Sequence, residues 1–258
     1  MLKVLQARFR QGFRTGKFPA VPPNLPEHFR GRPEITPDRC SDCRSRICLS
    51  ACPANAVQMA ENGVTIDLGR CLFCGKCAAA CESGAIRFTG EYRLGAMKRD
   101  SLICRPGAMP EPEQAENPEL RRLCGRSLKI RQVSAGGCAA CELDFNVLNT
   151  LAWDMGRFGI QVAASPRHAD CLLITGPVTE NMLLALKKTY AAVPRPAFVI
   201  ACGSCAVSGG IYAGSPVVHN GVEDILPVDL YVPGCPPHPA VLLEALLYLM
   251  GRKRGPIA

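Results

Sequence analysis

The sequence predicts a small α+β domain followed by an α/β domain with a mainly parallel sheet. Two observations carry this prediction: eight cysteines fall in two similar groups within residues 36–103, and short apolar segments alternate with helical segments from residue 128 onward. Strands that alternate with helices imply a parallel sheet with crossover connections. The 258 residues agree with two domains, since roughly 150 residues make one domain. We therefore divide the chain into residues 1–35, 36–103, 104–127 and 128–258.

The composition indicates a folded protein that binds metal. Hydrophobic residues make up 48% of the chain and charged residues 20%, which is enough apolar content to bury a core. No apolar run approaches the roughly 18 residues of a membrane span, and residues 1–20 lack the apolar segment of a signal peptide. We therefore expect a cytoplasmic protein without a transmembrane segment. In that reducing compartment, the 16 cysteines are expected to ligate metal rather than to form disulfides.

Residues 1–35 form a basic, proline-rich arm. Seven Lys and Arg residues stand against two Glu residues, and Phe9, Phe13 and Phe18 lie among them. We favour a strap around a neighbouring subunit; the alternative is an arm on an anionic membrane surface. Nucleic acid is not an expected partner, because aromatic residues are few and no binding motif is present. The net charge of +8 also falls to about +2 if three clusters of about −2 each are bound.

The eight cysteines of residues 36–103 form an internal repeat. The first unit reads Cys40-x2-Cys43-x4-Cys48-x3-Cys52, and the second reads Cys71-x2-Cys74-x2-Cys77-x3-Cys81. In the bacterial two-cluster pattern, the fourth cysteine of each unit ligates the cluster of the other unit. This rule assigns one [4Fe-4S] cluster to Cys40, Cys43, Cys48 and Cys81, and a second to Cys52, Cys71, Cys74 and Cys77. Structural zinc is the alternative, but two Cys-x2-Cys pairs would leave the other cysteines of each unit unexplained.

The first unit departs from the usual spacing. Four residues, among them Arg44 and Arg46, separate Cys43 from Cys48, where two residues are usual. Two cations near the first cluster would raise its reduction potential, because nearby charge tunes a cluster. Proline usually follows the last cysteine of the second unit, and Glu82 stands there instead.

Residues 104–127, with four prolines and a run of glutamates, are expected to link the domains. The α/β domain follows, with strands expected at residues 128–133, 159–163, 171–175, 197–201 and 230–232 and helices at 142–155, 181–192 and 240–250. Ligands of such sheets lie at loops beyond the carboxyl ends of the strands. Three of the expected strands are followed by glycine and then cysteine, at Cys138, Cys205 and Cys235. Cys141 lies three residues after Cys138. Four thiolates on one rim can hold a third cluster; the alternative is four unrelated buried cysteines.

These motifs give residues 128–245 a resemblance to a known family. Gly-Gly-Cys138-x2-Cys141-Glu142, Gly-x-Cys205-x2-Ser-Gly-Gly and Pro-Gly-Cys235-Pro-Pro resemble the small subunit of [NiFe] hydrogenases in its short form. Group 4 energy-converting hydrogenases, including formate hydrogenlyase, share this form with the cluster N2 subunit of respiratory complex I. The complex I subunit has two adjacent cysteines in the first motif, so the Cys-x2-Cys spacing here is similar to the hydrogenase branch.

The cysteine repeat resembles the dicluster ferredoxin-like subunit of the same complexes. The matching segments are Phe29-Arg-Gly-Arg-Pro33, Leu68-Gly-Arg-Cys71-Leu-Phe-Cys74-Gly-Lys-Cys77 and Glu91-Tyr92. The chain thus looks like a fusion of two electron-transfer subunits. The resemblance implies an α+β ferredoxin-like dicluster domain followed by an α/β flavodoxin-like domain.

The resemblance implies an electron-transfer subunit without a catalytic residue of its own. Three [4Fe-4S] clusters would relay electrons between a ferredoxin-type or formate dehydrogenase-type partner and a large subunit that carries the nickel–iron site. Cys138, Cys141, Cys205 and Cys235 would hold the proximal cluster, which faces that large subunit. Membrane subunits are further implied partners, which places the chain peripherally on the cytoplasmic side of the membrane. The alternatives are the equivalent subunit of a complex I-like or hydrogenase-related oxidoreductase without nickel, and a free-standing ferredoxin-like carrier.

Glu142 and His168 are candidates for proton transfer or hydrogen bonding near the proximal cluster. Glu142 is also explained as an acidic residue at a helix start, and His168 as a structural histidine.

Four further cysteines are not needed as ligands. Cys171 is expected in the core, Cys202 competes weakly with Cys205 as a ligand, and Cys104 and Cys124 are expected to be spare.

Overall fold

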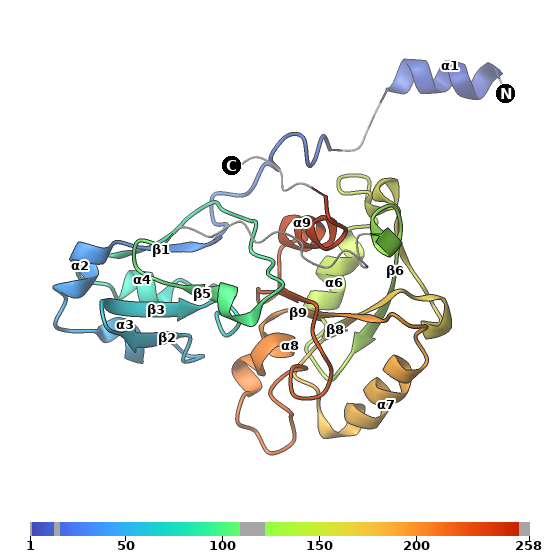
Figure 1. Cartoon of the computed structure of the whole chain (residues 1–258). Helices are drawn as coiled ribbons and strands as arrows, with labels where there is room; N and C mark the ends of the chain where they lie inside the picture. Colours follow the sequence, from blue (N-terminus) through green and yellow to red (C-terminus); the bar gives the residue numbers. More distant parts are fainter. Residues whose placement is uncertain (1, 13–15, 109–121, 253–258) are drawn as a thin grey trace.

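The first domain is built from short antiparallel strands and short helices. The computed structural model describes residues 2–12, 16–108 and 122–252 (Figure 1). In this domain β1 (Pro33–Ile35) pairs with β4 (Ile86–Phe88), and β3 (Gly63–Asp67) pairs with both β2 (Val57–Ala60) and β5 (Ile103–Cys104). Helices α2 (Pro37–Ser41), α3 (Ile47–Ser50) and α4 (Lys76–Ala79) each carry a cysteine. This arrangement agrees with the expected α+β domain.

The second domain contains a five-stranded parallel sheet. Its strands are β6 (Leu128–Ser134), β7 (Ile160–Val162), β8 (Cys171–Thr175), β9 (Phe198–Cys202) and β10 (Leu230–Val232). They lie in the order β7–β6–β8–β9–β10, which is the 2-1-3-4-5 order of flavodoxin-like sheets. Every residue of β8, β9 and β10 is buried, as continuous apolar strands of a parallel sheet require. The predicted parallel sheet is confirmed.

Four helices of the second domain follow the carboxyl ends of strands. They are α6 (Ala140–Val147), α7 (Glu180–Ala191), α8 (Ser204–Ser208) and α9 (Pro239–Leu249). The expected helix over residues 142–155 is wrong beyond Val147, since the chain turns there and resumes as a 3₁₀ turn at Met155–Phe158. Asn149 and Thr150 favour turns over helix interiors, and the backbone N–H of Met155 closes the turn on the carbonyl of Leu148.

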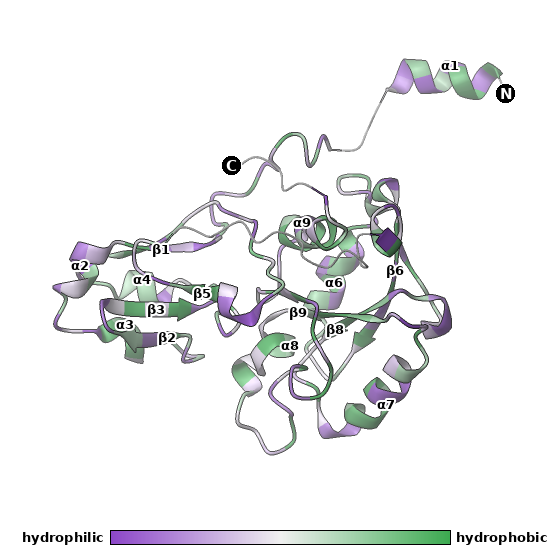
Figure 2. Cartoon of the chain, viewed as in Figure 1, coloured by the Kyte–Doolittle hydropathy of each residue, from purple (hydrophilic) through white to green (hydrophobic). Residues whose placement is uncertain are grey.

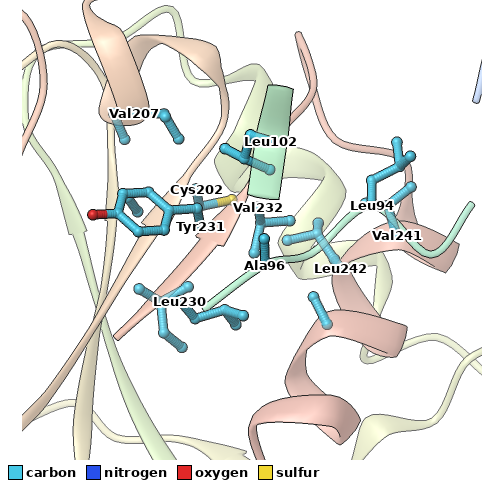
Figure 3. Packing of buried hydrophobic residues seen from close by; sticks show 14 of the residues in the cluster. Leu94, Ala96, Leu102, Cys202, Val207, Leu230, Tyr231, Val232, Val241 and Leu242 are labelled. Carbon is cyan, nitrogen blue, oxygen red and sulfur yellow. The ribbon is translucent and has the colours of Figure 1, made fainter. Parts of the chain in front are cut away.

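The hydrophobic core is continuous across the two domains. Figure 3 shows Leu94 and Ala96 of the first domain beside Leu230 and Leu242 of the second. Ala96 and Tyr231 exchange two backbone hydrogen bonds, of 3.0 and 2.8 Å, in an antiparallel bridge. The chain leaving the first domain therefore extends the edge of the sheet at β10. In Figure 2 the strands β8 and β9 and the helix α9 are mainly hydrophobic, in agreement with their burial.

The arm divides into a part that packs on this chain and a part that does not. The guanidinium of Arg157 donates to the carbonyls of Gly16 and Phe18, at 2.6 and 2.9 Å. The Phe18 ring lies 6.1 Å from the rings of both Tyr92 and Trp153, so it bridges the two domains. Helix α1 (Leu2–Gln11) has no buried residue and stands away from the body (Figure 1).

Two boundaries differ from the sequence prediction. Residues 33–35 form β1 rather than part of the arm, and Cys104 lies in β5 rather than in a linker. Much of the expected linker, residues 109–121, lies outside the described residues. Among the described residues, no helix is long and apolar enough to cross a membrane.

Candidate metal centres

The first cysteine set consists of Cys40, Cys43, Cys48 and Cys81. Cys40 is the buried residue of α2, and Cys48 is the buried residue of α3. Burial raises the pKa of the Cys48 thiol, and the neighbouring charges of Cys81, Cys40 and Cys43 raise it further. The four side chains therefore lie together although Cys81 comes from the second sequence unit.

The second cysteine set consists of Cys52, Cys71, Cys74 and Cys77. All four line one cavity of the first domain, together with apolar residues such as Ile66. Burial raises the pKa of Cys71 to about 12 and that of Cys77 to about 11, and charges within the set contribute to both shifts. The structure thus brings Cys52 of the first unit to the triplet of the second unit.

Backbone groups approach the sulfurs of these two sets closely. The N–H of Phe73 donates to Cys71 Sγ at 3.3 Å, and the N–H of Ala56 donates to Cys52 Sγ at 3.2 Å. Such bonds stabilise a thiolate more than a thiol. A Cβ at Gly63 would lie 2.8 Å from Cys40 Sγ, so this position requires glycine.

The third cysteine set consists of Cys138, Cys141, Cys205 and Cys235. Cys138 and Cys141 follow β6, Cys205 lies in α8 after β9, and Cys235 follows β10. Burial raises the pKa of Cys205 to about 12, and the charges of Cys235, Cys141 and Cys138 raise it as well. Cys138 and Cys235 are exposed. The four side chains therefore gather at one rim of the sheet, which is open to solvent.

Glycines leave room for the sulfurs of this third set. A Cβ at Gly203 would lie 2.5 Å from Cys141 Sγ, and a Cβ at Gly210 would lie 2.8 Å from Cys205 Sγ. Both glycines also have positive φ, +88° and +56°, which other residues adopt only with strain. Cys202 lies beside the set, where its side chain hydrogen-bonds to Cys141. This hydrogen bond lowers the pKa of the Cys141 thiol.

The three sets form a row. Helix α3, which carries Cys48 of the first set, packs against α4, which carries Cys77 of the second. The hydroxyl of Ser204, directly before Cys205 of the third set, donates to the carbonyl of Cys71 in the second set at 2.7 Å. The second set therefore stands between the other two.

All three sets offer soft thiolate donors, the ligands that iron–sulfur clusters use. Among the residues that the structure describes, no three of His, Cys, Asp or Glu come close enough to hold a single metal ion. A [4Fe-4S] cluster instead takes each thiolate on a separate iron. The cavity that the second set lines and the glycines beside the first and third sets fit such a group.

Glu142 connects the third set to the sheet. It lies in the first turn of α6, directly after Cys141, and its Oε1 accepts a hydrogen bond of 2.6 Å from the hydroxyl of Thr175. Thr175 is fully buried at the end of β8. The sequence did not predict this contact, because nothing in the local pattern of Thr175 points to Glu142.

His168 is not brought to this rim. It is exposed in the 3₁₀ turn Pro166–His168, which precedes β8 and so lies at the opposite end of that strand from Thr175. His238 lies nearer the third set, three residues after Cys235, where its Nδ1 accepts a hydrogen bond from the N–H of Ala240 at the start of α9.

Cys104 and Cys124, expected to be spare, and Cys171, expected in the core, are all buried. Cys104 lies in β5 and Cys171 in β8, and burial raises the pKa of both thiols. The charge of Cys124 acts on Cys171, so these two thiols are neighbours.

Two family models match the chain. Residues 138–249 match the 20 kDa subunit of NADH ubiquinone oxidoreductase, and residues 39–85 match a 4Fe-4S dicluster domain. The probable membrane-bound hydrogenase subunit mbhJ of Pyrococcus furiosus is 40% identical over 129 residues, which are 50% of this chain and 77% of that protein. An NADH-quinone oxidoreductase subunit of Citrifermentans bemidjiense is 45% identical over 116 residues, which are 45% of this chain and 68% of that protein. A chain in the structure of the membrane-bound sulfane sulfur reductase, an archaeal respiratory membrane complex, is 34% identical, with a TM-score of 0.45 over 54% of this chain and 80% of that chain.

Proposed function

The chain belongs to the family of the 20 kDa subunit of NADH ubiquinone oxidoreductase, and we propose that it is the electron-transfer subunit of a membrane-associated, energy-converting [NiFe] hydrogenase. In this proposal it holds three [4Fe-4S] clusters between a ferredoxin-type or formate dehydrogenase-type partner and a large subunit with the nickel–iron site. The observation that carries the proposal is the row of three cysteine sets. A row of this kind suits one-electron relay from one end of the chain to the other.

The residues of this chain supply position and environment. Each bound cluster would accept and release single electrons. The first set would be held by Cys40, Cys43, Cys48 and Cys81, the second by Cys52, Cys71, Cys74 and Cys77, and the third by Cys138, Cys141, Cys205 and Cys235. In the second set Cys71 and Cys77 are buried and Cys74 is exposed, whereas the third set has two exposed thiols, Cys138 and Cys235. The shared core fixes the spacing between the two domains.

The large subunit is proposed to cover the third set. Three apolar side chains near this rim are exposed, Leu143 at 66%, Ile211 at 59% and Val217 at 61%. Leu143 lies two residues after Cys141, and the backbone of Ile211 hydrogen-bonds to Cys205. Exposed apolar side chains around two exposed thiols are typical of a surface that a partner buries. The same exposure argues against a free-standing carrier.

Helix α1 supports a peripheral place at the membrane. Leu2, Leu5 and Phe9 share one face and are 85%, 59% and 87% exposed. Basic residues flank that face, and the helix has no acidic residue in its first turn. We propose that α1 docks on a membrane subunit of the complex, on the cytoplasmic side, while residues 16–35 strap the two domains of this chain.

Glu142 is proposed to orient the ligand helix α6 through Thr175, at the interface with the large subunit. Its carboxylate lies in the first turn of the helix, where a negative charge interacts favourably with the helix dipole. No role near the clusters is proposed for His168, given its place at the far end of β8.

A complex I-like oxidoreductase without nickel is the second candidate. The 45% identity to a subunit of an NADH-quinone oxidoreductase favours it. The Cys138-x2-Cys141 spacing favours the hydrogenase. Elemental analysis of the complex that copurifies anaerobically with this chain separates the two. Nickel in a one-to-one ratio with the large subunit supports the hydrogenase, and iron and sulfide without nickel move the chain to the second candidate.

A further inference from the structure

Ser204 makes the closest polar contact between the two domains at the cysteine sets. It begins α8 and is 1% exposed. Its hydroxyl lies 2.7 Å from the carbonyl oxygen of Cys71 and 3.1 Å from that of Gly234. The carbonyl of Gly234 already accepts the backbone N–H of Ser204 at 2.8 Å. The hydroxyl has a single proton, and the shorter distance directs it to the carbonyl of Cys71.

The residues around this contact belong to both the second and the third cysteine set. Cys71 is a member of the second set. Cys205 follows Ser204 in the sequence and Cys235 follows Gly234, and both are members of the third set. One buried hydroxyl thus joins the backbone of the second set to the backbone of the third. From Cys71 to Cys205 the chain of bonds is interrupted only by this hydrogen bond.

Electron transfer between fixed centres weakens steeply with the gap that the electron must cross outside covalent bonds. A hydrogen bond of 2.7 Å is a shorter gap than a van der Waals contact between carbon atoms, at roughly 3.5–4.0 Å. Removing the hydroxyl would lengthen the gap without altering any thiol.

Ser208 provides a natural comparison one helical turn later. Its hydroxyl lies 2.9 Å from the carbonyl of Gly69 and 3.2 Å from that of Ser204. It therefore also docks α8 on the loop before Cys71, but it contacts the backbone of no cysteine.

We infer that Ser204 is a positioning residue that holds the second cysteine set against the third and provides the hydrogen-bonded contact through which electrons pass between them. This inference rests on the proposed function, because it requires clusters at both sets. Docking of α8 and electron transfer can be separated, because Ser204 and Ser208 both dock the helix. Only Ser204 provides the contact between the two cysteine sets.

The test compares Ser204→Ala with Ser208→Ala in the anaerobically purified complex. Dithionite reduction and EPR first establish the cluster signals of the wild-type protein. Hydrogen exchange of the amides in residues 68–75 then measures docking. We expect both variants to raise the exchange rate about fivefold, the ratio that corresponds to a hydrogen bond worth about 1 kcal/mol.

Freeze-quench EPR, with a reduced two-cluster ferredoxin as electron donor, measures how fast the third cluster is reduced. We expect Ser204→Ala to slow this step several-fold, Ser208→Ala to leave it near the wild-type rate, and Ser204→Thr, which keeps the hydroxyl, to restore it. Equal rates of reduction of the third cluster in the two alanine variants would overturn the inference. This comparison does not depend on Ser204→Thr, so it remains valid if that variant does not fold. A wild-type protein without signals from the second and third clusters would overturn the proposed function itself.

Discussion

The guanidinium of Arg46 lies 3.7 Å from the sulfur of Cys40. Arg46 reaches this position from a left-handed backbone conformation, φ 48°, at the start of α3, and its second nitrogen donates to the carbonyl of Ser41. The extra residues between Cys43 and Cys48 therefore direct a cation at the first cysteine set. The expectation that this loop places positive charge there is met by Arg46.

Arg46→Gln should lower the reduction potential of the first cluster, because a cation favours the more negative, reduced form. We expect a shift of about 10–40 mV, since a partly exposed ion pair is worth about 0.2–1 kcal/mol and a one-electron change of 59 mV is tenfold. A redox titration followed by EPR measures it, with Arg44→Gln as the control. A first cluster with the lowest potential of the three in the wild-type protein would contradict this account.

Gly203→Ala should remove the third cluster and spare the other two. The added Cβ would lie 2.5 Å from Cys141 Sγ, so the sulfur cannot keep its place. Gly214→Ala is a matched control, because Gly214 has a similar φ of +83° and nothing within 4 Å of the added Cβ. Iron content and EPR distinguish clash from backbone strain: equal losses in both variants would show that the close approach to Cys141 is unimportant.

Glu142→Ala should loosen the ligand helix α6. The variant loses a hydrogen bond of 2.6 Å between a carboxylate and the buried Thr175 hydroxyl, worth about 1–3 kcal/mol. The denaturant midpoint of the anaerobic protein should fall accordingly, and Glu142→Gln, which keeps an acceptor, should fall less. Glu180→Ala serves as control, since Glu180 is largely exposed in its pair with His219. No difference between Glu142→Ala and that control would exclude the positioning role.

Deletion of residues 1–11 should weaken attachment to the membrane complex and leave the fold intact, because α1 has no buried residue. Deletion of residues 1–20 should do more, since it also removes Phe18 from between Tyr92 and Trp153. Copurification with the membrane subunits measures assembly, and circular dichroism measures folding. Full assembly of the shorter deletion would refute the proposed docking of α1.

The strands of the α/β domain were predictable because β8, β9 and β10 are short apolar runs, while β6 begins with alternating apolar and polar residues. The rim was predictable for the same reason: Cys138, Cys205 and Cys235 each follow a strand end. The placement of Cys52 and Cys81 with the triplet of the other unit was predicted from the bacterial two-cluster pattern. The helix expected over residues 142–155 was too long, because its apolar pattern continues through a segment that folds back at Met155.

Long-range polar contacts were not predictable from the sequence. The hydrogen bond from Thr175 to Glu142 joins residues 33 positions apart, and that from Ser204 to Cys71 joins residues 133 positions apart. Serine and threonine are common throughout the chain, and no periodicity marks the ones that meet a partner. Only the packing of the two domains selects them.

The central claim is tested most directly by elemental analysis of the anaerobically purified complex. Iron, acid-labile sulfide and zinc are measured, and a Mössbauer spectrum identifies the type of cluster. The account predicts iron and sulfide in the amounts that three [4Fe-4S] clusters require, no stoichiometric zinc, and loss of one cluster when Cys205 is replaced by Ala. Zinc in place of iron, or a full cluster content that the Cys205→Ala variant retains, would contradict the assignment of the three cysteine sets.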